Sequence, residues 1–166
     1  VIACNPRGST GRGHDFLRDV CGRKWGVNDL HDVLTSFKKM LKLMGIENKS
    51  YGIMGGSYGG FMTSWVIGHH PKMFKSAIVE RALLNWETMV GTSDIGIGFP
   101  EMYLLDDMNN NLNLYRKKSP ITYAPNSKNQ IPKNDTTIKP ISVYSCSRIT
   151  IGTVLLLGIP NFVFNS

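Results

Sequence analysis

The feature that most constrains this fold is a glycine cluster around one serine, "YGIMGGSYGG" at residues 51–60. The residues that lead into it, "SYGIM", are mostly apolar and typical of a buried strand. After the cluster, apolar residues recur at helical spacing at Phe61, Met62, Trp65 and Val66. The stretch therefore predicts a strand, a tight glycine turn and a helix in immediate succession.

The same stretch fits the pattern Gly-x-Ser-x-Gly. Gly55, Ser57 and Gly59 form the pattern, and further glycines stand at Gly56 and Gly60. In a nucleophile elbow the serine lies on a sharp strand-to-helix turn, whose flanking positions are too crowded for side chains. Ser57 is therefore a candidate nucleophile. The alternative is a glycine-rich turn in which Ser57 only caps the helix that follows.

Strands and helices alternate along the first half of the chain. "VIAC" at residues 1–4 predicts a strand, and "KSAIVERA" at 75–82 predicts another. Between them, apolar residues from Asn28 to Gly45 recur at i, i+3, i+4 and i+7, which predicts an amphipathic helix. The alternation favours an α/β class with a mostly parallel sheet and helices on both faces. Ligands of such sheets bind at the carboxyl ends of the strands, where Ser57 falls.

Composition argues against several classes of function. The 166 residues are 42% hydrophobic, as in one globular domain, and the net charge of +7 is scattered rather than interleaved with aromatics. We therefore expect no nucleic-acid partner. The longest apolar segment, 149–164, is too short and too broken to span a bilayer, so no membrane partner is expected. Cys4, Cys21 and Cys146 are widely spaced and odd in number, which predicts neither disulfides nor zinc and favours the cytoplasm. With no phosphate loop or metal ligands, no cofactor is expected.

Six segments in order carry a resemblance to a known family. They are "NPRGSTG" at 5–11, "KWGVNDLHDV" at 24–33, "GIMGGSYGGFMTSWVIGHHP" at 52–71, "LLNW" at 83–86, "GTSDIG" at 91–96 and "SPITYA" at 119–124. Together they resemble the catalytic α/β-hydrolase domain of the prolyl oligopeptidase family, most closely its acylaminoacyl-peptidase-like branch. The resemblance covers about residues 1–124 and implies an incomplete α/β-hydrolase fold.

The resemblance implies a role for the two residues at the centre of the cluster. Ser57 would attack a peptide carbonyl and form an acyl-enzyme. The backbone N–H of Tyr58 would be one oxyanion-hole donor. In the family the second donor belongs to an earlier His-Gly-Gly type segment, which this sequence does not contain. Arg12 also departs from the family, where a tyrosine usually follows "NPRGSTG".

A triad histidine is not identifiable. The triad of α/β-hydrolases runs in the order Ser, Asp or Glu, His. His14 and His31 precede the serine, and no histidine follows position 70. His69 and His70 lie at the far end of the predicted helix, some 15 Å or more from Ser57 at about 1.5 Å per residue. We therefore interpret them as surface or helix-terminal residues.

The triad aspartate is not identifiable either. The resemblance implies a hydrophobic strand and a Gly-Glu-x-Asp-like segment after "SPITYA". If "TVLLLGIPNF" at 153–162 is that strand, Asn161 stands where the aspartate is expected. Asp94 matches a family motif and is interpreted as structural or as shaping the substrate pocket. Asp106 and Asp107 fall in a polar loop.

The character of the sequence changes near residue 125. Residues 125–140 are polar, contain three prolines and lack periodicity, and a β-rich run follows at 141–159. We therefore divide the chain into a partial peptidase catalytic domain, 1–124, and a divergent tail, 125–166. The tail is interpreted as disordered or as the product of a shifted reading frame.

Three hypotheses for function remain. The first is a serine peptidase fragment, whose parent cleaves oligopeptides or N-acylated peptides through an acyl-enzyme on Ser57. The second is a non-catalytic remnant or interaction module, and the third is a carboxylesterase-like hydrolase, because the same elbow also cleaves esters. The motifs favour the peptidase as ancestry. The missing base favours the remnant for the present activity of the chain. The oligomeric state is not predicted.

Overall fold

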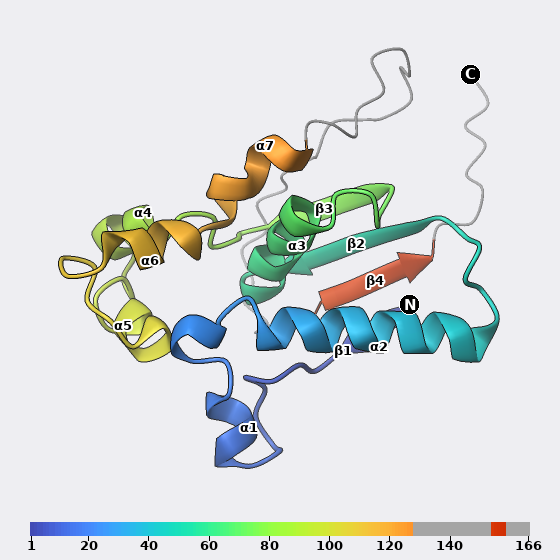
Figure 1. Cartoon of the computed structure of the whole chain (residues 1–166), viewed down its shortest axis with the longest axis horizontal. Helices are drawn as coiled ribbons and strands as arrows, with labels where there is room; N and C mark the ends of the chain where they lie inside the picture. Colours follow the sequence, from blue (N-terminus) through green and yellow to red (C-terminus); the bar gives the residue numbers. More distant parts are fainter. Residues whose placement is uncertain (128–153, 159–166) are drawn as a thin grey trace.

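The computed structural model describes residues 1–127 and 154–158 (Figure 1). In chain order the elements are β1 Ile2–Cys4, α1 His14–Arg18, the 3-10 turn η1 Gly22–Lys24, α2 Asn28–Met44, β2 Tyr51–Gly56, α3 Tyr58–His69, β3 Ser76–Glu80, α4 Trp86–Thr92, α5 Gly98–Leu104, α6 Leu112–Lys117, the 3-10 turn η2 Pro120–Tyr123, α7 Ala124–Ser127 and β4 Val154–Gly158.

Within the described residues, four strands form one sheet in the order β1-β4-β2-β3. β2 and β3 pair in parallel, from Gly52 opposite Ser76 to Gly56 opposite Glu80. β4 is antiparallel to both β1 and β2, so β1, β2 and β3 share one direction (Figure 1). The α/β class with parallel pairing is therefore confirmed. β4 lies within the β-rich run predicted at 141–159, but the sequence did not predict its antiparallel place between β1 and β2.

The two longest helices cover the same face of the sheet. The ring of Tyr51 on β2 packs edge-on against Phe37 of α2, with centroids 5.1 Å apart, while Gly55 of β2 contacts the backbone of Gly59 on α3. Alternate residues of a strand share a face, so both contacts lie on one side. Ile78 of β3 points the other way and is 36% exposed. The expected helical layer on the second face is not found within residues 1–127.

The long helix α2 follows its sequence prediction. Val33, Phe37 and Leu41 are buried along one stripe. Gly45 ends the helix in a left-handed conformation, with φ of 65°, and its N–H bonds back to the carbonyls of Leu41 and Lys42. The apolar periodicity and the terminal glycine therefore predicted correctly where this helix begins and ends.

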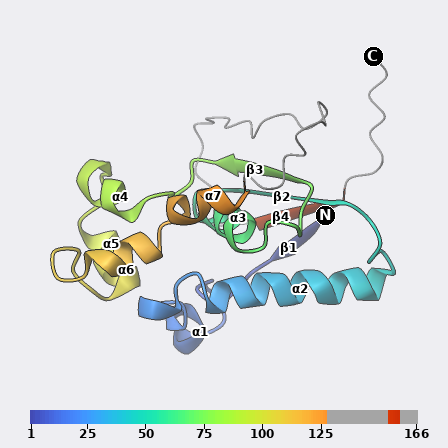
Figure 2. The same cartoon turned by 45° about the horizontal axis from the view of Figure 1, so that its top comes forward.

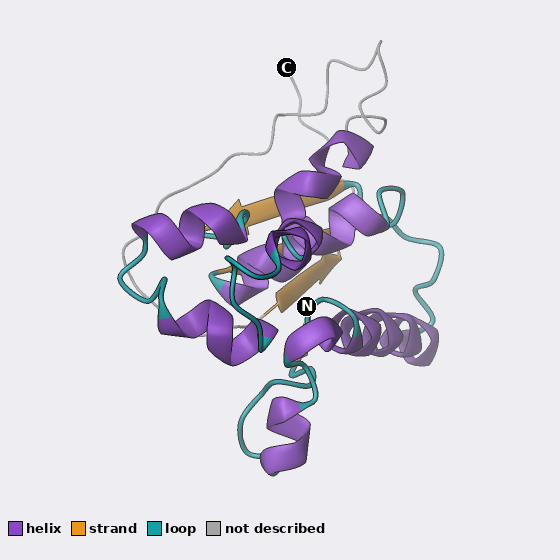
Figure 3. Ribbon diagram, turned by 60° about the vertical axis from the view of Figure 1, so that its left-hand side comes forward, coloured by secondary structure: helices purple, strands orange, loops and turns teal. Residues whose placement is uncertain are grey.

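Beyond the carboxyl ends of β2 and β3, the short helices α4, α5 and α6 form a group (Figures 1 and 2). Figure 3 shows the helices, in purple, and the strands of the sheet, in orange, from another side. Trp25, only 2% exposed, links α4 and α5 to α3. Its ring contacts Tyr58, Phe61, Trp86 and Tyr103 at centroid distances of 5.0 to 5.5 Å. An aromatic core therefore fixes the loop before α2 against the start of α3.

The predicted tail lies partly outside the described residues. Residues 128–153 and Asn161 fall outside them, as does Cys146. Cys4 and Cys21 are free thiols. In the described ranges, no helix has both the length and the apolar character that a membrane span requires.

Candidate active site

Ser57 lies at the turn between β2 and α3 in a strained conformation. Its φ of 56° and ψ of −118° lie in a region that non-glycine residues rarely occupy. Two backbone hydrogen bonds hold it there: its N–H donates to the carbonyl of Glu80 at 3.0 Å, and its carbonyl accepts from Phe61 at 3.0 Å. The hydroxyl makes no capping bond to α3. The geometry is that of an elbow, and the capping alternative is not supported.

Two of the four elbow glycines are required by backbone crowding. A Cβ atom on Gly55 would lie 2.4 Å from the carbonyl oxygen of Gly59, and one on Gly60 would lie 2.6 Å from that of Glu80. At Gly56 the obstacle is the end of the Arg81 side chain, at 2.8 Å, which can move away. The close approach of β2, α3 and β3 therefore excludes side chains at Gly55 and Gly60.

Tyr58 places a backbone donor directly after the serine. It is the first residue of α3, and the first N–H groups of a helix have no acceptor within the helix. Among the described residues no other group accepts from this N–H. The helix start also carries partial positive charge. The Tyr58 N–H therefore has no acceptor among the described residues, and its oxyanion-hole role stays a prediction.

The Tyr58 side chain is anchored to a buried carboxylate. Its hydroxyl donates to Oδ2 of Asp29 at 2.8 Å, and Oδ1 of Asp29 accepts from the N–H of Leu30 at 2.9 Å. Asp29 is fully buried, and burial raises its pKa above the ordinary value. Burial also raises the pKa of Tyr58 well above its ordinary value, and the nearby Asp29 charge adds to the rise.

Sequence reasoning missed the role of Asp29. The residue stands inside "KWGVNDLHDV", one of the segments that carried the resemblance. The sequence feature that could have indicated this role is an acidic residue in the first turn of α2, on the buried face that is otherwise apolar. Nothing in the sequence indicated its partner, because Tyr58 is 29 residues away.

The loop that presents Asp29 is tied down from two sides. Nζ of Lys118 donates to the carbonyls of Arg23 at 2.6 Å and Trp25 at 2.7 Å. Nε1 of Trp65, on α3, donates to the carbonyl of Gly26 at 2.6 Å. Burial lowers the pKa of Lys118. These contacts fix the start of α2 against the elbow helix, so that Asp29 stays opposite Tyr58.

The described residues bring no histidine into hydrogen-bond contact with Ser57. Nδ1 of His69 lies 2.8 Å from the carbonyl of Trp65, and His70 ends α3. Burial is the main cause that lowers the pKa of His70. His31 is exposed on α2, 3.8 Å from Asp32. His14 begins α1. The absence of an identifiable triad histidine therefore stays a prediction for the chain as a whole.

The candidate acids are engaged elsewhere. Asp106 accepts from the side-chain amide of Asn111 at 2.8 Å, and Asp107 bonds to the asparagines that follow it in the same loop. Asp94 is exposed and accepts from the Ser93 hydroxyl at 3.2 Å. None of the three bonds to a histidine within residues 1–127. In those residues, no three His, Cys, Asp or Glu side chains form a metal-binding group either.

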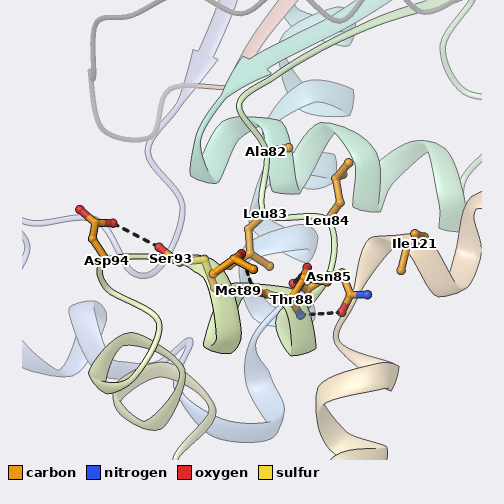
Figure 4. Close-up of a pocket in the computed structure, with 10 residues that line it drawn as sticks. Ala82, Leu83, Leu84, Asn85, Thr88, Met89, Ser93, Asp94 and Ile121 are labelled. Atoms are coloured by element: carbon orange, nitrogen blue, oxygen red, sulfur yellow. Dashed lines mark hydrogen bonds between the residues drawn. The ribbon is translucent and has the colours of Figure 1, made fainter.

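An open cavity of about 750 Å³ lies beside the elbow (Figure 4). It begins at Ala82, two residues after the Glu80 carbonyl that binds Ser57. Its lining residues are Ala82, Leu83, Leu84, Asn85, Thr88, Met89, Thr92, Ser93, Asp94 and Ile121. The wall is mostly apolar, and the Asn85 side chain in it caps α4 by accepting from Glu87 at 2.8 Å. Asp94 lies in this wall, and its pocket-shaping role stays a prediction.

The parallel β2–β3 pair, the strained serine and the following helix define the α/β-hydrolase class. Comparison with known families then gives the family itself. The chain belongs to the prolyl oligopeptidase family, which matches residues 1–137.

Individual relatives agree with this assignment. An uncharacterized peptidase of Bacillus subtilis, YuxL, is 39% identical over 127 residues, which cover 76% of this chain and 19% of the relative. The acylamino-acid-releasing enzyme of Mus musculus is 32% identical over 142 residues, with 79% of this chain and 19% of that enzyme covered. The chain thus spans about a fifth of the length of the curated relatives it matches.

Solved structures show the same similarity. The acylaminoacyl peptidase of Pyrococcus horikoshii, in an orthorhombic crystal form, superposes with a TM-score of 0.68 at 36% identity, over 74% of this chain and 20% of that one. An acylaminoacyl peptidase in complex with Z-Gly-Gly-Phe-chloromethyl ketone gives 0.68 at 37% identity, with the same coverage.

Proposed function

We propose that Ser57 is the nucleophile of a serine peptidase that cleaves oligopeptides or N-acylated peptides through an acyl-enzyme. The observation that carries this proposal is the strained Ser57 with the unpaired N–H of Tyr58 next to it. Attack by the Ser57 oxygen on a peptide carbonyl would form a tetrahedral oxyanion within reach of that N–H. One such donor is worth about 10²–10³ in rate.

We propose further that the cavity beside the elbow receives an apolar side chain or acyl group of the substrate. Leu83, Leu84, Met89 and Ile121 supply its apolar wall. Burial of such a group stabilises the bound substrate by about 25 cal/mol per Å² of apolar surface. A relative that was solved with a peptide chloromethyl ketone ending in phenylalanine supports this choice.

The described residues supply neither a histidine in contact with Ser57 nor a candidate acid paired with a histidine. Without a base, a serine hydroxyl is a weak nucleophile at neutral pH. We propose that the 166 residues alone lack the base, so that the chain by itself is the non-catalytic form of a peptidase site. Added imidazole should then act as the missing base, because under this proposal Ser57 supplies the nucleophile and the Tyr58 N–H supplies one oxyanion donor.

The test uses the 166-residue chain and its Ser57→Ala variant. Hydrolysis of N-acetyl-alanine p-nitroanilide and p-nitrophenyl acetate, and labelling by a fluorophosphonate probe, are followed with and without added imidazole as a general base. We expect imidazole-dependent reaction of the chain above the Ser57→Ala background, with the adduct on Ser57. The anilide and the ester separate peptidase from carboxylesterase chemistry.

Two results contradict parts of this proposal. Anilide hydrolysis in plain buffer that disappears in Ser57→Ala would mean that the 166 residues contain their own base. No reaction of Ser57 with any of the three reagents, even in imidazole, would favour the interaction-module hypothesis instead.

A further inference from the structure

A second hollow, which we call the α2–α3 groove, lies away from the elbow. It has a volume of about 730 Å³ and is lined by Arg23, Gly26, Val27, Leu30, His31, Leu34, Trp65, His69, Asn111, Asn113, Leu114, Lys117, Lys118 and Tyr123. These residues come from η1 and the loop before α2, from α2, from the second half of α3, from α6 with the residues at its two ends, and from η2. Neither Ser57 nor any residue of the cavity in Figure 4 belongs to it. A volume of this size suits a ligand of a few residues.

The floor of the α2–α3 groove is apolar. Leu30 and Leu34 of α2 and Leu114 of α6 are half-buried, and Trp65 beneath them is 4% exposed. Val27, at the start of α2, is 51% exposed. The groove therefore offers apolar surface that water still reaches, and a ligand side chain would cover it.

The rim of the α2–α3 groove is cationic. Arg23 and Lys117 are exposed, and neither forms an ion pair within the described residues. No aspartate or glutamate lines the groove. Lys118 also lines it, but its ammonium group donates to the carbonyls of Arg23 and Trp25 and is held in place. A ligand with carboxylates would thus find two unpaired cations and no opposing charge.

His69 supplies a directed acceptor in the same groove. Its ring lies between Trp65 and Tyr123, with centroids 4.2 and 4.1 Å away. Nδ1 is 2.8 Å from the Trp65 carbonyl, and a carbonyl can only accept, so Nδ1 carries the proton. In the neutral ring Nε2 therefore holds a lone pair, which suits the backbone N–H of a peptide.

We propose that the α2–α3 groove binds a short acidic peptide segment with an apolar side chain at its centre. The apolar side chain covers Leu30, Leu34 and Leu114, and carboxylates on either side of it pair with Arg23 and Lys117. A peptide N–H donates to Nε2 of His69. Charge complementarity selects the acidic partner, because the rim is cationic and the chain carries a net charge of +7.

The test is fluorescence anisotropy with fluorescein-labelled Glu-Asp-Leu-Phe-Asp-Glu and the folded 166-residue chain. Two control peptides replace either the four acids by lysine or the central Leu-Phe by Ser-Ser. We expect binding of the first peptide, weakening as salt rises, and at least about tenfold weaker binding of both controls.

Matched charge reversals locate the site. Arg23→Glu combined with Lys117→Glu should weaken binding at least about tenfold. Lys38→Glu combined with Lys39→Glu changes the net charge by the same amount on exposed residues of α2 outside the groove, and should leave binding within about twofold. Ser57→Ala should bind like the parent, which separates this proposal from the peptidase site. Thermal melts of both double variants establish that they are folded.

Three outcomes would overturn the proposal. Equal weakening by the two double variants would mean that net charge alone attracts the peptide. If the Ser-Ser peptide bound as tightly as the Leu-Phe peptide, the apolar floor of the groove would not contribute to binding. No binding of the acidic peptide at low salt by the folded chain would remove the site altogether.

Discussion

Replacing Tyr58 by phenylalanine removes one hydroxyl from the elbow and leaves the ring in place. That hydroxyl donates to Oδ2 of the fully buried Asp29 at 2.8 Å. A hydrogen bond to a charged group contributes about 1.5–3 kcal/mol, and here the acceptor left behind cannot turn to water. We expect Tyr58→Phe to lower the free energy of unfolding by about 2 kcal/mol, which corresponds to a fall in Tm of about 4–8 °C.

Tyr115→Phe is the matched control. The Tyr115 hydroxyl donates at the same distance, 2.8 Å, to the carbonyl oxygen of Asp106, and Tyr115 is 1% exposed. Because that acceptor is neutral, its loss should cost only about 0.5–1.5 kcal/mol. Urea unfolding followed by tryptophan fluorescence measures both variants, since the Trp25 ring packs edge-on against Tyr58 at 5.3 Å.

A double-mutant cycle isolates the pair. In an Asp29→Asn background the acceptor is neutral, so Tyr58→Phe should cost about 1 kcal/mol less than in the parent. A Tyr58→Phe loss no larger than that of Tyr115→Phe, together with a coupling energy below about 0.3 kcal/mol, would refute the charged anchor. The Tyr58 N–H would then be positioned by packing alone.

Three further predictions concern the elbow and its anchor. Gly55→Ala should lower the free energy of unfolding by more than about 3 kcal/mol, because the added Cβ atom would lie 2.4 Å from backbone. At Gly98 an added Cβ atom would meet nothing within 4 Å, so Gly98→Ala should change the free energy of unfolding by less than about 1 kcal/mol. Urea unfolding measures both variants. Ser57→Gly should raise it by about 1 kcal/mol by removing the positive-φ strain, and should abolish fluorophosphonate labelling; a loss of stability would contradict the strain. Burial raises the pKa of Asp29 in the folded state above its unfolded value of 3.8. The stability that the protonated Asp29 carboxyl group contributes is therefore fully present below pH 3.8 and is lost as the pH rises through the folded-state pKa. The stability of Asp29→Asn relative to the parent should therefore increase with pH in melts from pH 4 to 8, and a flat difference would contradict the raised pKa.

Local patterns predicted the elements that position the candidate nucleophile. The apolar stripe and terminal glycine predicted α2, and the glycine spacing predicted a turn at Ser57, because both depend on residues close together in the chain. The strain at Ser57 accompanies close backbone contacts among Gly55, Gly59 and Glu80, and the glycines in the sequence indicate where such close contacts occur. A glycine that the fold requires is visible in the sequence, because it marks a position where the backbone leaves no room for a side chain.

Non-local pairings could not be predicted in the same way. Tyr58 donates to the side chain of Asp29, 29 residues earlier. The Lys118 ammonium group donates to the carbonyls of Arg23 and Trp25, which lie more than 90 residues earlier. Each partner alone is an ordinary polar residue of a helix or a loop. Only the packing of α3, the loop before α2 and the end of α6 makes them buried partners, and no periodicity encodes that contact.

The placement of β4 shows the same limit at the level of the sheet. β1 and β2 run in the same direction but do not pair, and the first 80 residues offer no strand to lie between them. Their facing edges would leave backbone donors and acceptors unpaired. Leu156 of β4 lies opposite both Ile2 and Ile53, so one antiparallel strand satisfies both edges at once. Composition indicated a β-rich run at 141–159, which contains β4, but neither composition nor periodicity predicts the strands with which it pairs. β4, which lies in the predicted tail, thus pairs with β1 and β2 of the predicted catalytic domain, and the division at residue 125 stays a prediction.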